Sequence, residues 1–328
     1  MSTDIKRIAV MTSGGDAPGM NAAVRAVVRA ASYHKLHVLG IKHGYEGLIS
    51  GEVERLERRT VGNIIHRGGT FLKTARSERF RTAEGRAEAF DTVQAHDIDA
   101  LVVIGGNGTY TGGKIFGEEY GLPVIGIPGT IDNDIRGTDL TIGYDTAVNT
   151  AMDCVDRIRD TAESHSRTFF VEVMGRHSGF IALSTAVATG SGRVLIPESS
   201  EGTLDTTIAF LRKSIKRKKK FSLIIVAEGN PYGGAVEVAA KVTEAIPEME
   251  ARVAVIGHLQ RGGSPTRLDR ILASRLGYGA VEALIAGQRG VAVGLVNDEL
   301  TYTPLAEAIE AHKPVSEEML RLAEILAI

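Results

Sequence analysis

Two aspartates two residues apart occupy a short segment rich in small residues, Pro128-Gly129-Thr130-Ile131-Asp132-Asn133-Asp134. The segment follows an apolar run at 124–127 that is typical of a buried strand. Because an ionised carboxylate is costly to bury without a partner, Asp132 and Asp134 are poor core residues. A cation or a hydroxyl to be deprotonated would be a suitable partner. Both occur in phosphoryl transfer, in which a base orients the acceptor and a metal ion neutralises charge.

The spacing of the two aspartates suggests a division of labour. If the segment is extended, alternate side chains lie on one side of the chain, so both carboxylates face the same way. Asp132 would then act as the base, while Asp134 would hold Asp132 or the acceptor. An N-cap residue combined with a turn aspartate is the structural alternative.

Two glycine-rich turns are candidate phosphate-binding loops. Thr12–Asp16 and Gly105–Thr109 each follow an apolar run and precede a helical pattern. Glycine lets backbone amides approach a ligand closely, and the N-terminus of the next helix attracts an anion. A tight turn without a ligand is the alternative for either loop taken alone.

Two common nucleotide motifs are incomplete around the second turn. Most of a P-loop pattern is present at Gly108, Gly113 and Lys114. Ile115, however, stands where the magnesium-binding Ser or Thr is required. Thr111 replaces the third glycine of the dinucleotide-binding pattern. The sequence therefore predicts neither a P-loop NTPase nor a dinucleotide site.

Several arginines lie in or beside the glycine-rich loops. A planar guanidinium recognises phosphate oxygens in pairs. A single arginine is more often a surface residue, but several of them favour a doubly phosphorylated complex. His258 could donate a hydrogen bond to a sugar, or it could be an ordinary core or surface histidine. The arginines are Arg76, Arg167, Arg176, Arg252 and Arg261.

A second basic group falls outside these loops. Arg25 and Arg29 are one helical turn apart and share a helix face. Arg58 and Arg159 are candidate partners of this face, and a basic tract occupies 216–220. A solvated surface is the alternative reading for the face and for the tract.

Short Val/Ile-rich runs alternate with helical patterns along the chain. The alternation predicts an α/β fold with parallel sheets and helices on both faces. Ligands of such sheets bind at the carboxyl ends of strands, so the loops above are expected to converge. The expected strands are 7–11, 36–41, 100–104, 124–127, 168–173, 222–226 and 253–256.

The composition excludes several classes of protein. With 328 residues the chain is longer than one core usually fills, so two domains are expected. The net charge of -2 favours neither nucleic acid nor a membrane surface. No apolar run approaches the ~18 residues of a membrane span. Cys154 is the single cysteine, which excludes an intrachain disulfide and favours a reducing, cytoplasmic location.

Four motifs, in order along the chain, resemble those of bacterial ATP-dependent 6-phosphofructokinases. The resemblance extends from about Lys6 to Ala311. Its most specific parts are the proline-to-aspartate segment and the His-x-Gln-Arg-Gly-Gly loop. The motifs are Thr12–Asn21, Pro128–Asp134, Met174–Arg176 and Gly257–Pro265.

The resemblance implies the phosphofructokinase fold. Two Rossmann-like α/β/α domains with mostly parallel sheets would face each other across an active-site cleft. The larger, ATP-binding domain would contain 1–142 and 261–312. The smaller, sugar-phosphate-binding domain would contain 143–260 and 313–328. The family is typically a homotetramer.

For the chemistry, the resemblance implies that ATP and fructose 6-phosphate give ADP and fructose 1,6-bisphosphate, with Mg²⁺. Asp132 would be the base on the sugar 1-hydroxyl, and Thr130 and Asp134 would position that acceptor. Arg176, assisted by Thr130, would stabilise charge on the transferring phosphoryl group. Asn107 and Asp132 would lie at the metal.

The other implied contacts fall into two groups. ATP and its phosphates would be held by Gly15, Tyr45, Arg76, Gly108 and Thr109. The sugar phosphate would contact Met174, Gly175, Glu228, His258 and Arg261, together with the catalytic residues above. Arg167 and Arg252 would reach the 6-phosphate from a neighbouring subunit, so the active sites of the homotetramer would be shared.

Two positions bear on the phosphoryl donor. Pyrophosphate-using members of the family carry an acid at the place of Gly108 and a lysine at the place of Gly129. Glycine at both favours ATP. The alternatives are a pyrophosphate-dependent phosphofructokinase, a NAD or lipid kinase, and a regulatory nucleotide-binding paralogue with weak catalysis. The motifs above argue against the NAD or lipid kinase.

The chain departs from the family at two places. Asn107 stands where the family usually has aspartate, so weaker Mg²⁺ binding is expected. The resemblance also implies a cationic effector site for ADP and phosphoenolpyruvate. By residue count, Gly192 stands at the position of the carboxylate in that site, so the response to ADP is expected to change. The residues of that effector site would be Arg25, Arg29, Arg58, Arg159, Arg217 and Lys219.

Overall fold

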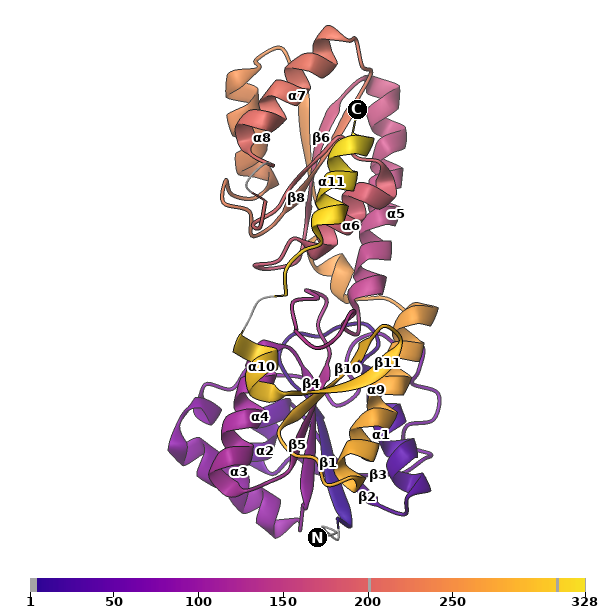
Figure 1. The fold of residues 1–328 in the computed structure, drawn as a ribbon, viewed down its shortest axis with the longest axis vertical. Helices are drawn as coiled ribbons and strands as arrows, with labels where there is room; N and C mark the ends of the chain where they lie inside the picture. Colours follow the sequence, from indigo (N-terminus) through magenta and orange to yellow (C-terminus); the bar gives the residue numbers. More distant parts are fainter. Residues whose placement is uncertain (1–4, 200–201, 311–312, 328) are drawn as a thin grey trace. The chain divides into compact units, whose positions relative to one another are not determined.

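The computed structural model describes residues 5–199, 202–310 and 313–327 (Figure 1). The chain forms two compact α/β units. The larger unit contains Met1–Thr130, Ile135–Asp145 and Arg261–His312. The smaller unit contains Ile131–Asp134, Thr146–Gln260 and Lys313–Ile328.

A mostly parallel sheet forms the centre of the larger unit. Its strands are β1 (Arg7–Thr12), β2 (His37–Ile41), β3 (Val53–Leu56), β4 (Ala100–Gly105), β5 (Val124–Pro128), β10 (Val291–Val296) and β11 (Glu299–Pro304). Within the described residues their order is β11-β10-β5-β4-β1-β2-β3. The strands from β10 to β2 run parallel, and the edge strands β3 and β11 pair antiparallel to their neighbours.

The register of this sheet brings its loops to one edge. β4 and β5 are buried along their whole length, as expected of central parallel strands covered on both faces. Thr12 pairs with Ile104, and Gly105 pairs with Pro128. The carboxyl ends of β1, β4 and β5 are therefore level, and the loops that follow them begin side by side.

Helices cover both faces of this sheet (Figure 1). One face carries α1 (Met20–Tyr33) and α9 (Arg267–Ile285). The other carries α2 (Gly44–Ser50), α3 (Ala83–Ala95), α4 (Asn107–Tyr120), α10 (Leu305–Glu310) and the short 3-10 helix η1 (Arg79–Arg81). Gly277 allows α1 and α9 to approach closely, because a Cβ there would lie 2.6 Å from the Ala26 Cβ.

The smaller unit is built on a parallel sheet. Its strands are β6 (Thr168–Val173), β7 (Arg193–Leu195), β8 (Ser222–Ala227) and β9 (Ala251–Val255). In the part of the chain that is described, their order is β7-β8-β6-β9. Val173 pairs with Ala227 and Glu172 with Val255, so these loops also begin at one edge. β9 is an edge strand, and Val255 is 55% exposed.

The helices of the smaller unit lie on both sides of its sheet (Figure 1). α7 (Leu204–Lys216) and α8 (Ala235–Ala245) close a core with Phe170 and Ile224 on one face. α5 (Tyr144–His165), α6 (Phe180–Thr189) and α11 (Glu317–Leu326) lie on the other. The short 3-10 helix η2 (Gly257–Arg261) follows β9.

The predicted α/β class with mostly parallel sheets is confirmed, but β3, β7, β10 and β11 were not among the expected strands. β3 has the sequence Val-Glu-Arg-Leu, which is too short and too charged to stand out as a strand. None of the helices in the described ranges is both long and apolar enough to cross a membrane.

Candidate functional site

The two glycine-rich loops of the larger unit are locked together. The Ser13 amide donates to the Ile104 carbonyl at 3.0 Å, and the Thr109 hydroxyl donates to the Ser13 carbonyl at 3.0 Å. A Cβ at Gly105 would lie 2.5 Å from that same Ser13 carbonyl oxygen. Only glycine at the end of β4 therefore lets the β1 and β4 loops approach this closely.

Gly108, in the first turn of α4, faces open space. No atom lies within 4 Å of the position that its Cβ would occupy. The helix of 14 residues behind it carries the positive end of its dipole at this point. The arrangement suits a phosphate that approaches the backbone of the β4–α4 loop.

Gly15 and Arg261 meet at the β1 loop. A Cβ at Gly15 would lie 2.7 Å from the Arg261 Nη1, and that nitrogen donates to the Asp16 carbonyl at 3.0 Å. The structure thus places the Arg261 guanidinium against the loop predicted to hold nucleotide phosphates. Its predicted contact with the sugar phosphate stays a prediction.

Tyr45 and Thr109 lie beneath the loops. Tyr45 is 6% exposed and stacks on Phe80, and burial raises the pKa of its hydroxyl. That hydroxyl donates to the Thr109 carbonyl at 2.6 Å. Thr109 is 3% exposed. In this structure both residues shape the β4–α4 loop, and their predicted contact with ATP is untested.

The segment 73–76 borders the β1 loop. The Thr12 hydroxyl donates to the Lys73 carbonyl at 2.8 Å, and the Thr74 hydroxyl donates to the Gly14 carbonyl at 2.7 Å. Arg76 follows two residues later with an exposed side chain. It is therefore available to an anion near the glycine-rich loops.

Thr130 completes the row of strand ends in the larger unit. The Gly129 amide donates to the Gly105 carbonyl at 3.0 Å. The Thr130 Cβ lies 3.6 Å from the position that a Gly106 Cβ would take. Thr130 therefore stands next to the β4 loop, and its role in the reaction stays a prediction.

The segment after Thr130 is bent at Asn133. Asn133 has φ +53°, in the left-handed region. The chain is therefore not extended between Asp132 and Asp134, so the condition under which alternation would place both carboxylates on one side is not met. Both aspartates are half-buried. The Ser178 hydroxyl donates to the Asp132 carbonyl at 2.6 Å and ties this segment to the β6–α6 loop.

The loop after β6 holds an unusual backbone. Gly175 has φ +143° and Arg176 has φ +55°. The Arg176 amide donates to Glu228 Oε1 at 2.7 Å, and a Cβ at Gly229 would overlap the Arg176 carbonyl oxygen. The loop thus closes against the end of β8 and leaves the Arg176 side chain exposed. Met174, before it, is 8% exposed.

Arg167 and Arg252 are joined through one carboxylate. Glu250 Oε1 lies 2.8 Å from Arg167 Nε and 2.6 Å from Arg252 Nη2. The hydrogen bond from Arg167 lowers the pKa of the Glu250 carboxyl, and the charge of Arg252 adds to the effect. The two arginines predicted to share one phosphate are therefore neighbours. His258 is exposed on η2.

The predicted effector residues fall in both units. Burial and the nearby Arg29 charge lower the pKa of Arg25, as expected of two cations on one helix face. Arg58 is exposed in the same unit. In the smaller unit, Arg159 donates to the Thr189 carbonyl and lies over the Phe221 ring.

Two cationic side chains of the smaller unit lie over the ring of Phe210. Arg193 and Lys219 lie over its ring at 5.2 and 5.4 Å from the centroid. Its Cζ lies 2.7 Å from the position that a Cβ at Gly192 would take. Arg217 is exposed beside Lys219. A side chain longer than glycine at 192 would require this ring to move.

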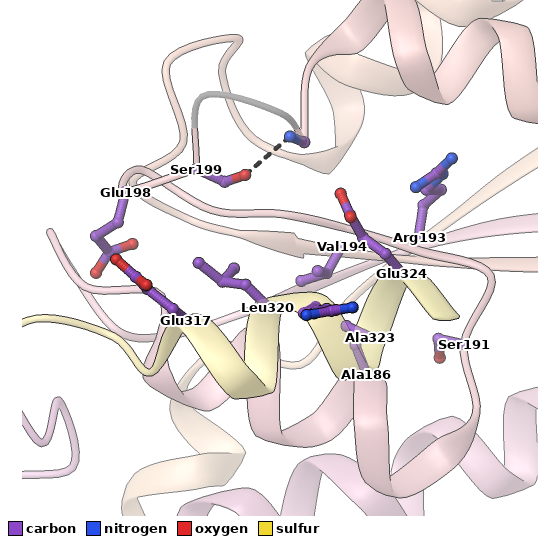
Figure 2. Close-up of a pocket in the computed structure, with 12 residues that line it drawn as sticks. Ala186, Ser191, Arg193, Val194, Glu198, Ser199, Glu317, Leu320, Ala323 and Glu324 are labelled. Atoms are coloured by element: carbon purple, nitrogen blue, oxygen red, sulfur yellow. Dashed lines mark hydrogen bonds between the residues drawn. The ribbon is translucent and has the colours of Figure 1, made fainter. Parts of the chain in front are cut away.

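A cavity of about 490 Å³ lies in the smaller unit between β7, α6 and α11 (Figure 2). Arg193 and Glu324 stand at one end of it, and Glu198 and Glu317 at the other. It contains none of the predicted catalytic or substrate residues. Glu198 also accepts a hydrogen bond from the Gly179 amide at 2.8 Å, at the start of α6.

Two side chains with a structural connection to the site were not singled out from the sequence. They are Ser178 and Gln260, whose hydrogen bonds join the loops of the smaller unit. The His-x-Gln-Arg-Gly-Gly motif contains Gln260, but a motif does not show which backbone atoms a side chain reaches. Among the described residues, no group of three or more His, Cys, Asp or Glu side chains is placed to hold a metal.

The fold and loops together define a class. Both units are α/β structures whose glycine-rich loops follow parallel strands, and several carry exposed cationic side chains suited to phosphates. The chain belongs to the phosphofructokinase family, whose model, described as "Phosphofructokinase", matches residues 7–284.

The similarity to individual relatives covers nearly the whole chain. One is the "ATP-dependent 6-phosphofructokinase 2" of Bacteroides thetaiotaomicron, 52% identical over 324 residues that cover 99% of each chain. Another is the "ATP-dependent 6-phosphofructokinase 1" of Thermus thermophilus, 55% identical over 99% of this chain and 100% of the relative. The solved phosphofructokinase of Saccharomyces cerevisiae superposes with a TM-score of 0.88 at 36% identity, over 98% of this chain. The chain spans 48% of that yeast chain, about half of its length.

Proposed function

We propose that the chain is an ATP-dependent 6-phosphofructokinase. It transfers the γ-phosphoryl group of ATP to the 1-hydroxyl of fructose 6-phosphate and gives ADP and fructose 1,6-bisphosphate, a kinase reaction of glycolysis. The observation that carries the proposal is the 52% to 55% identity, over nearly the full length, to relatives with that activity in their names. Two structural features also support the proposal. The β1 and β4 loops of the larger unit are joined by hydrogen bonds, and the loop after β6 in the smaller unit is held by Glu228.

The proposed chemistry assigns one role to each group. The Asp132 carboxylate accepts the proton of the sugar 1-hydroxyl as that oxygen attacks the γ-phosphorus, and the bond to the ADP oxygen breaks. Arg176 stabilises the charge on the transferring group, with help from the Thr130 hydroxyl. Asp134 helps to position the acceptor. Glu228 holds the left-handed backbone at Arg176 and so fixes the point from which this exposed side chain extends.

The residues for substrate and nucleotide follow the same division. The sugar phosphate is bound by Met174, Gly175, Glu228, His258, Arg261, Arg167 and Arg252. ATP is bound by Gly15, Tyr45, Arg76, Gly108 and Thr109. Tyr45 and Thr109 act from beneath the loop, because their hydroxyls are already donated to the carbonyls of Thr109 and Ser13.

Magnesium fits this donor set. Mg²⁺ keeps several waters and is usually bound by one or two carboxylates together with substrate phosphates. Asp132 offers a carboxylate oxygen, Asn107 an amide oxygen, and the nucleotide the rest. The ion, when bound, would spread the negative charge of the β- and γ-phosphates. Asn107 brings no charge of its own, so the nucleotide would carry more of the binding.

Gly108 and Gly129 favour ATP as the phosphoryl donor. Gly108 leaves open space where a longer residue would crowd the α-phosphate. Gly129 is packed, since a Cβ there would lie 3.0 Å from the Met20 Cε and from the Ile104 Cγ2. A lysine in its place would not fit without a shift of these core side chains.

A coupled assay tests the activity. ADP release is measured with ATP and Mg²⁺, with and without fructose 6-phosphate, for the wild type and for Asp132→Asn. We expect sugar-dependent release that falls about 10²- to 10⁴-fold in Asp132→Asn, the usual contribution of a general base. Asp91→Asn, a change of an exposed carboxylate on α3, is the matched control and should leave turnover unchanged.

Each competing function predicts a different outcome of this assay. Turnover with pyrophosphate in place of ATP would identify a pyrophosphate-dependent enzyme. Nucleotide binding without sugar-dependent turnover would identify a regulatory paralogue. Full turnover in Asp132→Asn would reject the proposed base.

Regulation and assembly complete the proposal. The enzyme is a cytoplasmic homotetramer with shared active sites. Arg25, Arg29, Arg58, Arg159, Arg217 and Lys219 bind the phosphates of an allosteric effector such as phosphoenolpyruvate. The response to ADP is changed, because Gly192 provides no carboxylate for the metal ion bound to ADP. Saturation curves for fructose 6-phosphate with and without phosphoenolpyruvate test this, and identical curves would remove the allosteric claim.

A further inference from the structure

Gln260 is a polar residue in a fully buried place. It is 0% exposed, at the end of the loop that carries His258. A buried amide is costly unless both its oxygen and its nitrogen find partners. The position of those partners therefore shows what the residue does.

The Gln260 side chain joins the ends of three elements. Its Oε1 accepts from the Met174 amide at 2.8 Å, directly after β6. Its Nε2 donates to the Ala147 carbonyl at 3.3 Å, in the first turns of α5. Ala147 is also 0% exposed. The β6–β9 ladder ends with the Ile256 amide donating to the Glu172 carbonyl, so Gln260 continues the connection where the backbone pairing stops.

The loop from Met174 to Arg176 is held at both ends by side-chain acceptors. Gln260 accepts from the Met174 amide, and Glu228 accepts from the Arg176 amide at 2.7 Å. Between them, Gly175 has φ +143° and Arg176 φ +55°. A non-glycine residue in the left-handed region is strained and persists only when the surroundings fix it. The two acceptors supply that fixation.

We propose that Gln260 is a positioning residue for the phosphoryl transfer, which sets the loop of Met174, Gly175 and Arg176 against the loop of His258. The inference rests on the proposed function, because it concerns the geometry of groups assigned there. Gln260 touches neither reactant. It acts through the backbone, and a neutral amide suits a fully buried place that supplies one donor and one acceptor.

Gln260→Met tests the proposal. Methionine has nearly the same length and leaves the Met174 amide and the Ala147 carbonyl without their partner. We expect kcat/KM for fructose 6-phosphate to fall between about tenfold and about a hundredfold, because small misplacements of positioning groups cost that much. In Gln260→Glu the new carboxyl keeps an acceptor for the Met174 amide, but only its protonated form can donate to the Ala147 carbonyl. At low pH, where that carboxyl is protonated, kcat/KM should therefore lie between the values of wild type and Gln260→Met.

A stability-matched control separates positioning from folding. Thr207 in α7 is 1% exposed, and its hydroxyl donates to the Thr203 carbonyl at 2.9 Å. Thr207→Val also removes a buried hydrogen bond, but outside the site. It should lower the urea midpoint without changing kcat or KM. The dissociation constant of ADP, measured by calorimetry, should be unchanged in both variants, because the nucleotide loops belong to the other unit.

The outcomes distinguish this inference from the proposed function. If the wild type shows no sugar-dependent turnover, the proposed function fails. If the wild type is active and Gln260→Met keeps its kcat and KM, or loses activity only in proportion to its lost stability as Thr207→Val does, the positioning role is rejected. A loss in kcat/KM beyond that of the control, with unchanged ADP affinity, supports it.

Discussion

Asn107 is a position at which the resemblance described from the sequence implies a departure from the family. It opens α4 beside Gly106 and offers an amide oxygen to a cation. A carboxylate there would add a negative charge to the ligands of the metal ion. It would also interact favourably with the positive end of the helix dipole. These two effects can be measured separately.

Asn107→Asp should therefore strengthen the binding of Mg²⁺. We expect the Mg²⁺ concentration at half-maximal turnover to fall, while fixed saturating ATP keeps nucleotide binding constant. The helix should also gain about 0.3–1 kcal/mol from the acid in its first turn. A gain in the urea unfolding free energy without any change in the magnesium midpoint would reject the metal role of this position.

Glu250 gives a pH-dependent prediction. Its pKa in the folded protein is lowered below the ordinary 4.5, chiefly by the hydrogen bond from Arg167. A carboxyl with a lowered folded pKa contributes stability above its unfolded pKa and loses that contribution as the pH falls through the folded value. The effect is small, because the group is exposed to solvent and screened.

Unfolding of the wild type and of Glu250→Gln, followed against pH, checks this sign. The wild type should be the more stable at neutral pH, and the difference should disappear below pH 4.5. A difference that grows as the pH falls would show that the carboxylate is not held by Arg167 in the folded protein.

At the scale of elements, the β4–α4 turn contains two glycines in different surroundings. Packing requires glycine at Gly105 but not at Gly108. A Cβ at Gly105 would overlap the Thr109 side chain and lie 2.5 Å from the Ser13 carbonyl oxygen. A Cβ at Gly108, three residues later, would meet nothing within 4 Å. Packing therefore constrains the first position and leaves space at the second.

Gly105→Ala and Gly108→Ala form a matched pair. We expect Gly105→Ala to lower the unfolding free energy by about 1–3 kcal/mol through overpacking. Gly108→Ala should be neutral or stabilising by up to ~1 kcal/mol, because alanine is the better helix former. Urea denaturation measures both, and equal losses would show that the β1 and β4 loops are not interlocked as described.

At the scale of the whole molecule, the exposed edge of β9 and the Arg167–Glu250–Arg252 cluster belong to one surface of the smaller unit. Arg252 and the neighbouring Val253 and Val255 are exposed on this strand. An exposed, partly apolar edge strand is a natural place for a second chain to pair. The proposed shared active sites place a neighbouring subunit here.

Subunit complementation checks the sharing. Asp132→Asn and Arg252→Ala should each be weakly active alone, because one lacks the base and the other a phosphate contact. Co-expressed, they should form hybrid tetramers that regain activity, since one subunit supplies Asp132 and its neighbour Arg252. The two variants mixed after assembly are the control. No recovery on co-expression would mean that each subunit uses its own Arg252.

The sequence by itself determined the α/β class, the central strands, the glycine-rich loops and the family. These features are local, because apolar runs mark buried strands and glycine marks close backbone approach. The bend at Asn133, the burial of Tyr45, the Glu250 bridge and the two hydrogen bonds of Gln260 were decided only by the tertiary structure. The partners of Gln260 lie 86 and 113 residues away along the chain, and no local pattern specifies a contact that exists only when distant segments fold against each other.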